Sequence, residues 1–102
     1  MTLAAELVER RHSCCVNVCP GVQSTYRWRG KVCHDSEFML VIKTTEEEFE
    51  AVAEALGELH PYELPEILSV PVLRAEERFL GWMSECLEKI PDRFADAVEE
   101  EE

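Results

Sequence analysis

The sequence predicts an α+β fold in which helices pack on one antiparallel sheet. Apolar residues alternate or run continuously over short stretches that are typical of strands, and they recur at helical spacing over others. The second half also reads as a complete β-α-β unit, built from 38–44, 45–59 and 66–74. The predicted order is α-β-β-β-α-β-α, which matches a β-α-β-β-α-β fold that lacks its first strand and carries an extra C-terminal helix.

The first half is predicted to contain one helix followed by strands. The helix spans 3–11, with Thr2 as its candidate N-cap. Strand-forming residues follow at 14–19 and 22–33, separated by a turn at Pro20-Gly21.

A further turn and strand lead into the clearest helix. The polar stretch HDSE (34–37) is interpreted as a turn, and the apolar stretch FMLVIKT (38–44) as a buried strand. The helix spans 45–59, where Thr45 is a good N-cap and Glu48 completes a capping box.

The last part of the chain is predicted to hold a strand and a helix. Pro61 ends the preceding helix, and a strand follows at 66–74, with Pro71 at an edge or a bulge. Apolar residues at helical spacing then predict a helix over 76–90, which Pro91 ends.

The length of the chain indicates one domain, and its charge argues against two classes of partner. The chain has 102 residues, of which 46% are hydrophobic, enough for one packed domain. We expect this domain over 1–91 and a disordered acidic tail over 92–102. The formal net charge of −12 argues against nucleic acid or a membrane surface as a partner, because both favour basic patches.

The cysteine pattern indicates a reducing compartment. An odd number of cysteines leaves at least one thiol unpaired, and none stands in a CxxC pair; they are Cys14, Cys15, Cys19, Cys33 and Cys86. The opening stretch MTLAAELVERR is charged and amphipathic, and no apolar run is long enough for a membrane span. We therefore expect a soluble cytoplasmic protein with free thiols.

The stretch HPYELPE, which begins at His60, contains a candidate divalent-cation site. His60, Glu63 and Glu66 supply one imidazole and two carboxylates, a set that suits Cu(II), Zn(II) or Ni(II). Pro61 and Pro65 reduce the conformational freedom that binding removes. The alternative is a structural loop, in which His60 interacts with the carbonyl end of the helix and the prolines set the turn.

Two other groups of side chains have alternative interpretations. Tyr26 and Trp28 share one face of a predicted strand, where they either stack a flat ligand or form a subunit interface. Lys43 precedes a helix start, which suits either an anion site or a salt bridge between subunits.

A catalytic role is the weaker interpretation of the cysteines. A nucleophile pair of Cys15 with His12 or His34 requires spatial proximity and a lowered thiol pKa. The sequence contains neither a Ser-His-Asp signature nor a glycine-rich phosphate loop. We expect a non-enzymatic protein without an organic cofactor.

Several motifs occur together in a specific order. They are CVN at 15–17, PG at 20–21, SxYxWxGK at 24–31, KT at 43–44, HPYExPEI at 60–67 and FLxW at 79–82. Through these motifs the chain resembles the CutA divalent-cation tolerance proteins, over about 3–87.

The resemblance implies a ferredoxin-like subunit, a homotrimer, and binding of copper or other divalent cations without enzymatic activity. It also implies that copper contacts involve His60 and a nearby carboxylate. The expected subunit contacts are Tyr26, Trp28, Lys43, Tyr62 and Trp82. The alternative function is a trimeric structural or signalling module that binds a partner protein without metal.

One departure from the family bears on the fold. Family members begin with a hydrophobic strand, central to the sheet, that has no counterpart before Leu3. Its loss would expose the backbone groups and apolar faces of its two neighbours. We therefore expect an N-terminally truncated sandwich. Three explanations of the missing strand are open: the chain is a fragment, a mis-started gene model, or a variant whose oligomer fills the gap.

Overall fold

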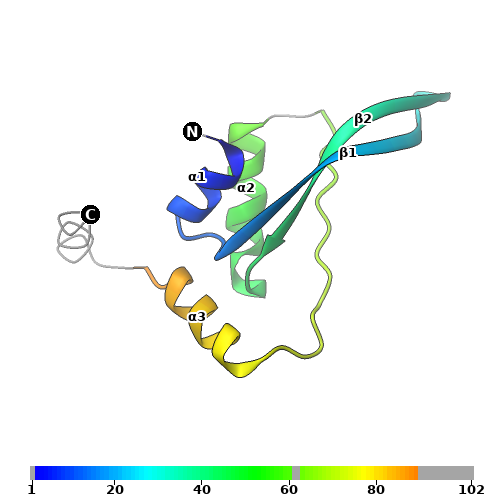
Figure 1. The fold of residues 1–102 in the computed structure, drawn as a ribbon. Helices are drawn as coiled ribbons and strands as arrows, with labels where there is room; N and C mark the ends of the chain where they lie inside the picture. The colour runs from blue at the N-terminus through cyan, green and yellow to red at the C-terminus, as the bar shows by residue number, and fades with distance from the viewer. Residues whose placement is uncertain (1, 61–62, 90–102) are drawn as a thin grey trace.

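The computed structural model describes residues 2–60 and 63–89 and has the predicted α+β class. A two-stranded antiparallel sheet lies beside the helices (Figure 1). The elements are α1 (Leu3–Glu9), β1 (Cys15–Trp28), β2 (Lys31–Lys43), the 3-10 turn η1 (Glu46–Glu48), α2 (Phe49–Leu59) and α3 (Glu77–Leu87).

The hairpin of β1 and β2 turns at Arg29 and Gly30. Trp28 pairs with Lys31, so the loop has two residues, with φ angles of 50° at Arg29 and 80° at Gly30. These left-handed conformations are typical of a type I′ turn, and glycine adopts them without steric cost. The turn predicted at 34–37 is wrong, because those residues lie inside β2 and pair with β1. Their polar side chains are tolerated there because this part of the strand is exposed.

Pro20 and Gly21 form a bulge within β1 rather than the predicted turn. The register shifts between Cys19 and Val22, and Gly21 has a φ of 74°. Proline has no N–H to donate to a ladder, so a bulge is a position where it can lie within a strand. The two strands predicted on either side are consequently one long strand.

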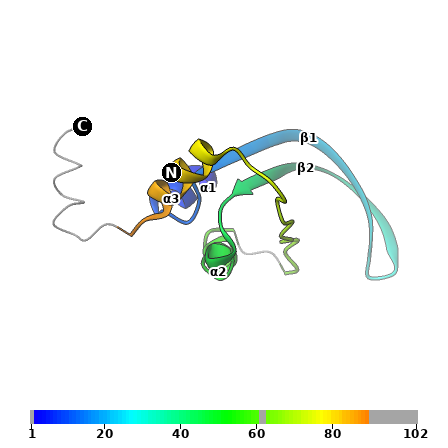
Figure 2. The ribbon, with the colours of Figure 1, turned by 90° about the horizontal axis from the view of Figure 1, so that it is seen from below.

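The hydrophobic core lies between one face of the hairpin and the first two helices. Leu7 of α1 is 0% exposed and packs with Val52 and Ala55 of α2. Val16 and Ile42, which pair across the hairpin, pack against this core from the sheet. Figures 1 and 2 show that the turn end of the hairpin projects beyond α1 and α2. Residues 25–38 at this end are exposed, apart from the half-buried Trp28 and Cys33.

The predicted helices are present. The predicted N-cap bond forms at the start of α1 but not at Thr45. Thr2 Oγ1 accepts a hydrogen bond from the Ala5 N–H at 3.1 Å, as an N-cap does. The capping box predicted for Thr45 and Glu48 is wrong. Thr45 makes no side-chain cap bond, and the Glu48 carboxylate instead contacts His12. A distant partner has displaced the local one.

The strand predicted over 66–74 is also wrong, because these residues have no regular secondary structure. The apolar pattern is present, but the sheet of the described residues contains only β1 and β2, so the segment has no ladder partner. Leu68, Val70, Val72 and Leu73 are consequently between 79% and 92% exposed.

The carboxylate of Glu76 caps α3 by accepting the N–H groups of Arg78 and Phe79 at 2.6 and 3.0 Å. The helix ends at Leu87, earlier than the predicted end at 90. The acidic tail predicted over 92–102 lies outside the described residues. None of the described helices has the length and apolar content needed to cross a membrane.

Candidate functional site

His60, the first predicted metal ligand, lies at the C-terminal end of α2. Its backbone N–H donates to the carbonyl of Leu56 at 2.8 Å, and the helix ends at Leu59, as the following Pro61 predicts. The His60 side chain is exposed. This backbone bond is compatible with the structural interpretation of the loop, and the exposure of His60 is compatible with the cation site.

Glu63, the second predicted ligand, forms an ion pair with Arg29 at the hairpin turn. The Arg29 Nη2 and Glu63 Oε1 atoms lie 2.6 Å apart, and the side chains are 69% and 68% exposed. The Arg29 guanidinium also lies 5.4 Å from the centroid of the Trp28 ring. Glu66, the third ligand, is exposed. The sequence contains no local signal for the Arg29 pair, because its two members are 34 positions apart.

The three predicted ligands are close in sequence without forming a compact cluster. Across residues 2–60 and 63–89, no three His, Cys, Asp or Glu side chains gather closely enough to hold a metal ion. Joint binding by His60, Glu63 and Glu66 therefore stays a prediction, and it requires the Glu63 carboxylate to leave Arg29.

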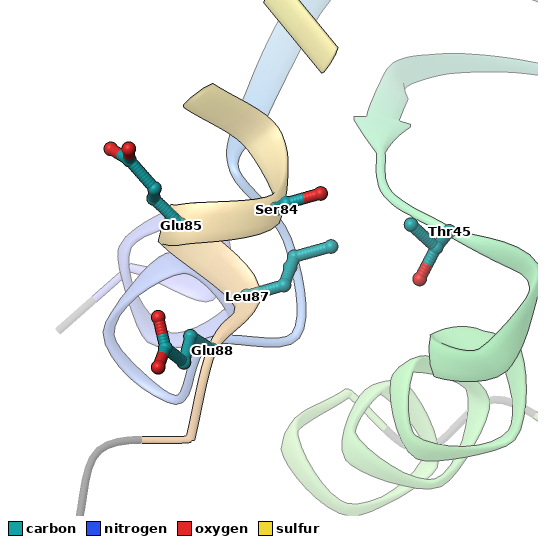
Figure 3. A pocket seen from close by; sticks show the side chains of 5 residues that line it. All are labelled: Thr45, Ser84, Glu85, Leu87 and Glu88. Atoms are coloured by element: carbon teal, nitrogen blue, oxygen red, sulfur yellow. The ribbon is translucent and has the colours of Figure 1, made fainter. Parts of the chain in front are cut away.

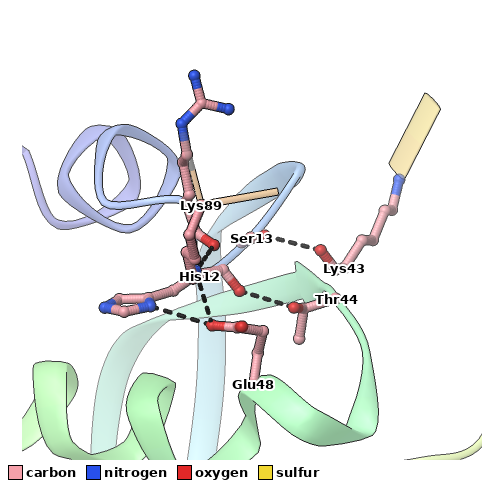
Figure 4. Close-up of polar contacts among 7 residues, drawn as sticks. His12, Ser13, Lys43, Thr44, Glu48 and Lys89 are labelled. Atoms are coloured by element: carbon pink, nitrogen blue, oxygen red, sulfur yellow. Dashed lines mark hydrogen bonds and ion pairs between the residues drawn. The ribbon is translucent and has the colours of Figure 1, made fainter. Parts of the chain in front are cut away.

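A polar cluster around Glu48, which directly precedes α2, contacts the segment after α1 and the segment after α3 (Figure 4). The Glu48 carboxylate lies 3.1 Å from His12 Nδ1 and 3.3 Å from Lys89 Nζ. Lys89 also donates to the carbonyl of Arg11 at 2.6 Å, and Thr44 donates to the carbonyl of His12 at 2.6 Å. Because the Glu48 side chain is only 16% exposed, these donors replace much of the water that would otherwise hydrate its carboxylate.

Ser13 anchors the start of the hairpin from the interior. It is 1% exposed, and its hydroxyl lies 2.8 and 2.9 Å from the carbonyls of Lys43 and Cys15. The Cys14 N–H donates to the same Lys43 carbonyl at 3.1 Å. No local pattern predicts these roles of Ser13 and Glu48, since their partners lie 30 and 36 positions away.

The thiols show no arrangement that is typical of catalysis. Cys14 is 6% exposed, and burial raises the pKa of its thiol, whereas a nucleophilic cysteine needs a lowered pKa. The imidazoles considered as partners of Cys15 contact other groups: His12 belongs to the polar cluster, and His34 Nδ1 lies 3.1 Å from Thr25 Oγ1. The expectation of a non-enzymatic protein stays a prediction.

An open hollow of about 380 Å³ lies between the end of α3 and the start of η1 (Figure 3). Its lining residues are Thr45, Ser84, Glu85, Leu87 and Glu88. Ser84 and Leu87 are directed toward Thr45, whereas Glu85 points away. The hollow lacks the convergent polar groups that fix a small ligand.

The side chains predicted at subunit contacts are largely accessible in the single chain. Tyr26 and Trp82 are 41% and 45% exposed, Trp28 and Lys43 are half-buried, and Tyr62 lies outside the described residues. Exposed aromatic side chains are typical of protein interfaces, and the contacts themselves stay a prediction.

Comparison with known proteins identifies relatives over most of the chain. The model of the family described as CutA1 divalent ion tolerance protein matches residues 1–86. The chain is 43% identical over 84 residues to the divalent-cation tolerance protein CutA of Thermus thermophilus, covering 82% of each protein. The solved Thermus thermophilus structure matches with a TM-score of 0.76 at 42% identity, over 78% of each chain. CutA1 from Oryza sativa matches with a TM-score of 0.81 at 33% identity, over 86% of this chain and 81% of that one.

Plant and animal relatives are longer than this chain. The chain is 37% identical over 81 residues to the chloroplastic CutA of Arabidopsis thaliana and covers 44% of that protein. It is 36% identical over 90 residues to CutA of Bos taurus and covers 51% of it. The chain thus spans about half the length of these relatives.

Proposed function

Because the chain belongs to the CutA1 divalent ion tolerance family, we propose that it binds divalent transition-metal ions and acts in cation tolerance as a non-enzymatic cytoplasmic homotrimer. The match over residues 1–86 carries the proposal, since relatives that share it are named as divalent-cation tolerance proteins. Cu(II) is the ion that we propose, because an imidazole with carboxylates suits it. The net charge of −12 favours cations over nucleic acid or anionic membranes.

The proposed ligands are His60, Glu63 and Glu66. All three side chains are exposed and lie within one short segment that begins at the end of α2. The competing pair with Arg29 costs little to break, because an ion pair between side chains that are 69% and 68% exposed is worth at most about 1 kcal/mol. Three protein ligands leave coordination positions for water or for another subunit.

A Cu(II) titration of the full chain against a competing chromophoric chelator tests this site. His60→Ala is expected to weaken Cu(II) binding by at least about tenfold, the order of loss seen when a metal site is perturbed. His34→Ala is the matched control, because His34 is also exposed but lies on the hairpin. Equal affinities for the wild type and His60→Ala would refute the site, and equal losses in both variants would assign binding to imidazoles in general.

Exposed apolar surface supports the homotrimer. An isolated two-stranded hairpin is marginal in water and needs further packing. Phe38 on β2 is 68% exposed, and Leu64 and Leu73 in the segment before α3 are 71% and 92% exposed. We propose that neighbouring subunits cover these surfaces and complete the ferredoxin-like sandwich that the sequence predicts.

Size-exclusion chromatography with light scattering tests the assembly. A single species at three times the 11.7 kDa chain mass supports the homotrimer, and a monomer contradicts it. The alternative function is a trimeric module that binds a partner protein without metal. The observation behind this alternative is that the described residues contain no cluster of three potential metal ligands. Saturable capture of one partner by the trimer in excess chelator would support this alternative, and capture that requires metal would count against it.

A further inference from the structure

The C-terminal end of α3 lies against the connection between α1 and β1. Arg11 Nη1 donates to the carbonyl of Cys86 at 3.2 Å, and Lys89 Nζ donates to the carbonyl of Arg11 at 2.6 Å. Leu87, next to Cys86, is 9% exposed and is directed toward Thr45 in Figure 3. These contacts hold Cys86 beside the segment that leads into the hairpin.

Cys14 lies in that same segment, directly before β1. Its N–H donates to the carbonyl of Lys43 at 3.1 Å, and its thiol lies 3.4 Å from the same oxygen. Lys43 is the last residue of β2, and Thr45, which faces Leu87, follows closely after it. Cys14 and the end of α3 therefore approach the same end of the hairpin.

The thiols of Cys14 and Cys86 act on each other electrostatically. The pKa of the Cys14 thiol is raised most by burial, next by the interaction with Cys86, and then by the interaction with the adjacent Cys15. Because the interaction between two charges weakens with distance, this order indicates that the Cys86 thiol is about as near to Cys14 as the thiol of a neighbour in the sequence. Both are free thiols in the structure and are available for covalent chemistry.

We propose that Cys14 and Cys86 form a reversible disulfide that tethers α3 to the start of the hairpin. The oxidant is a low-molecular-weight disulfide such as glutathione disulfide. The Cys86 thiolate attacks one sulfur of the oxidant, so that a mixed disulfide forms and one small thiol leaves with the proton. The Cys14 thiol then loses its proton to water, and its thiolate attacks the Cys86 sulfur and releases the second small thiol. Two electrons thus pass from the two protein thiols to the oxidant.

The surroundings of the two cysteines suit this order of steps. Cys86 is half-buried and open to the oxidant, whereas Cys14 is 6% exposed and reacts with the sulfur beside it. The second step takes place within one chain, and this proximity offsets the small thiolate fraction of Cys14. Residues 65–72 have no regular secondary structure, so no helix or strand there resists a small shift of α3. The chemistry needs no access to the sheet face that lies away from the helices, and it is compatible with the proposed homotrimer.

Oxidation of the full chain by glutathione disulfide tests the tether. The reduced protein is freed of reductant, incubated in excess chelator so that metal ions take no part, and analysed by intact mass and by peptide mapping after alkylation with iodoacetamide. We expect a product that has lost two hydrogen atoms, retains no glutathione and leaves Cys14 and Cys86 unalkylated until it is reduced. On a non-reducing gel it is expected to run at the 11.7 kDa chain mass.

Three alanine variants identify the partners. Cys14→Ala is expected to stop at the glutathione adduct of Cys86, and Cys86→Ala is expected to form no internal disulfide. Cys15→Ala is the matched control, because it removes the neighbouring thiol, and it is expected to leave the product unchanged. Loss of the product in Cys15→Ala, its persistence in Cys86→Ala, or a dimer linked between chains as the main product overturns the proposal. If Cys14→Ala does not fold, the wild-type peptide map decides the identity of the pair.

Hydrogen exchange tests the consequence for α3. The amides of Glu77–Leu87 are expected to exchange more slowly in the oxidised chain than in the reduced chain, while those of residues 27–32 at the hairpin turn are expected to keep their rates. Equal exchange of α3 in the two forms would overturn its tethering.

Discussion

The Glu48 carboxylate lies 3.1 Å from the Nδ1 atom of His12, 36 positions earlier in the chain. Glu48 stands where a capping box with Thr45 is predicted, yet it bonds His12 and Lys89 instead. One carboxylate thereby joins the connection between α1 and β1, the start of α2 and the segment after α3. Its negative charge should contribute to the stability of all three junctions.

Glu48→Gln is expected to lower the free energy of unfolding by about 1–2 kcal/mol. Hydrogen bonds to a charged group contribute about 1.5–3 kcal/mol, and the contact with Lys89 is discounted because that side chain is 56% exposed. Glutamine preserves size and one acceptor, so the loss reports the charge. Urea denaturation followed by circular dichroism measures the change.

Glu47→Gln is the control for this variant. Glu47 is an exposed neighbour in η1, so its replacement is expected to change the free energy of unfolding by less than about 0.5 kcal/mol. Equal losses in the two variants would contradict a specific role of Glu48.

Gly30→Ala and Gly57→Ala are expected to change stability in opposite directions. Gly30 has a φ of 80° in the hairpin turn, so alanine there costs about 1–2 kcal/mol of backbone strain. Gly57 lies within α2, where alanine is expected to stabilise by about 0.5–1 kcal/mol. An added Cβ meets no atom within 4 Å at either position, so the change in stability reports backbone conformation and not a steric clash. Chemical denaturation measures both, and a Gly30→Ala variant as stable as the wild type would argue against the type I′ turn.

Arg29→Ala is expected to raise Cu(II) affinity if Glu63 is a ligand. The variant frees the Glu63 carboxylate from an exposed ion pair worth at most about 1 kcal/mol, so the gain is up to about fivefold. Chelator competition measures it. Arg27→Ala is the matched control, because it removes the same charge from an exposed position on β1. A similar gain in both variants would indicate a general charge effect, and no gain in Arg29→Ala would count against Glu63.

Tyr26 is expected to ionise well above the ordinary pKa of a tyrosine. Its hydroxyl donates to Asp35, and this bond raises the pKa of Tyr26 from 10.0 to about 12. Because the pKa is raised in the folded chain, the bond contributes its full stability below about pH 10 and loses it as the pH rises through about 12. Ultraviolet titration of the phenolate measures this pKa, and a Tyr62→Phe background leaves Tyr26 as the single tyrosine.

Asp35→Asn is the variant that tests the cause. Loss of the carboxylate charge is expected to lower the pKa of Tyr26 toward its ordinary value, because an amide stabilises the protonated phenol less. A pKa that does not respond to Asp35→Asn would contradict the assignment to this bond.

The helices and the family were accessible from local information. Thr2 caps α1 as its position predicts, and α2 ends just before His60-Pro61, where proline excludes the helical conformation of the preceding residue. The resemblance to CutA proteins rests on motif order, and the family match over 1–86 confirms it. Both kinds of signal depend only on residues that are near one another or on their order in the chain.

Local sequence information did not predict the strands correctly. Residues 34–37 are polar enough to indicate a turn, yet the two-residue loop at Arg29-Gly30 fixes a register that places them inside β2. The stretch 66–74 has the apolar pattern of a strand but no neighbouring strand in the described sheet. In both cases the outcome depends on which backbone lies alongside, and residue type does not specify that.

The sequence by itself determined the recurrence of apolar residues, the approximate limits of the helices and the family of the protein. Only the tertiary structure decided the hairpin register, the contact of Glu48 with His12, the pairing of Arg29 with Glu63 and the exposure of the segment before α3. The reason is physical: ladders and ion pairs join groups that are distant along the chain, and their competition with local partners is settled only when the chain brings those groups together.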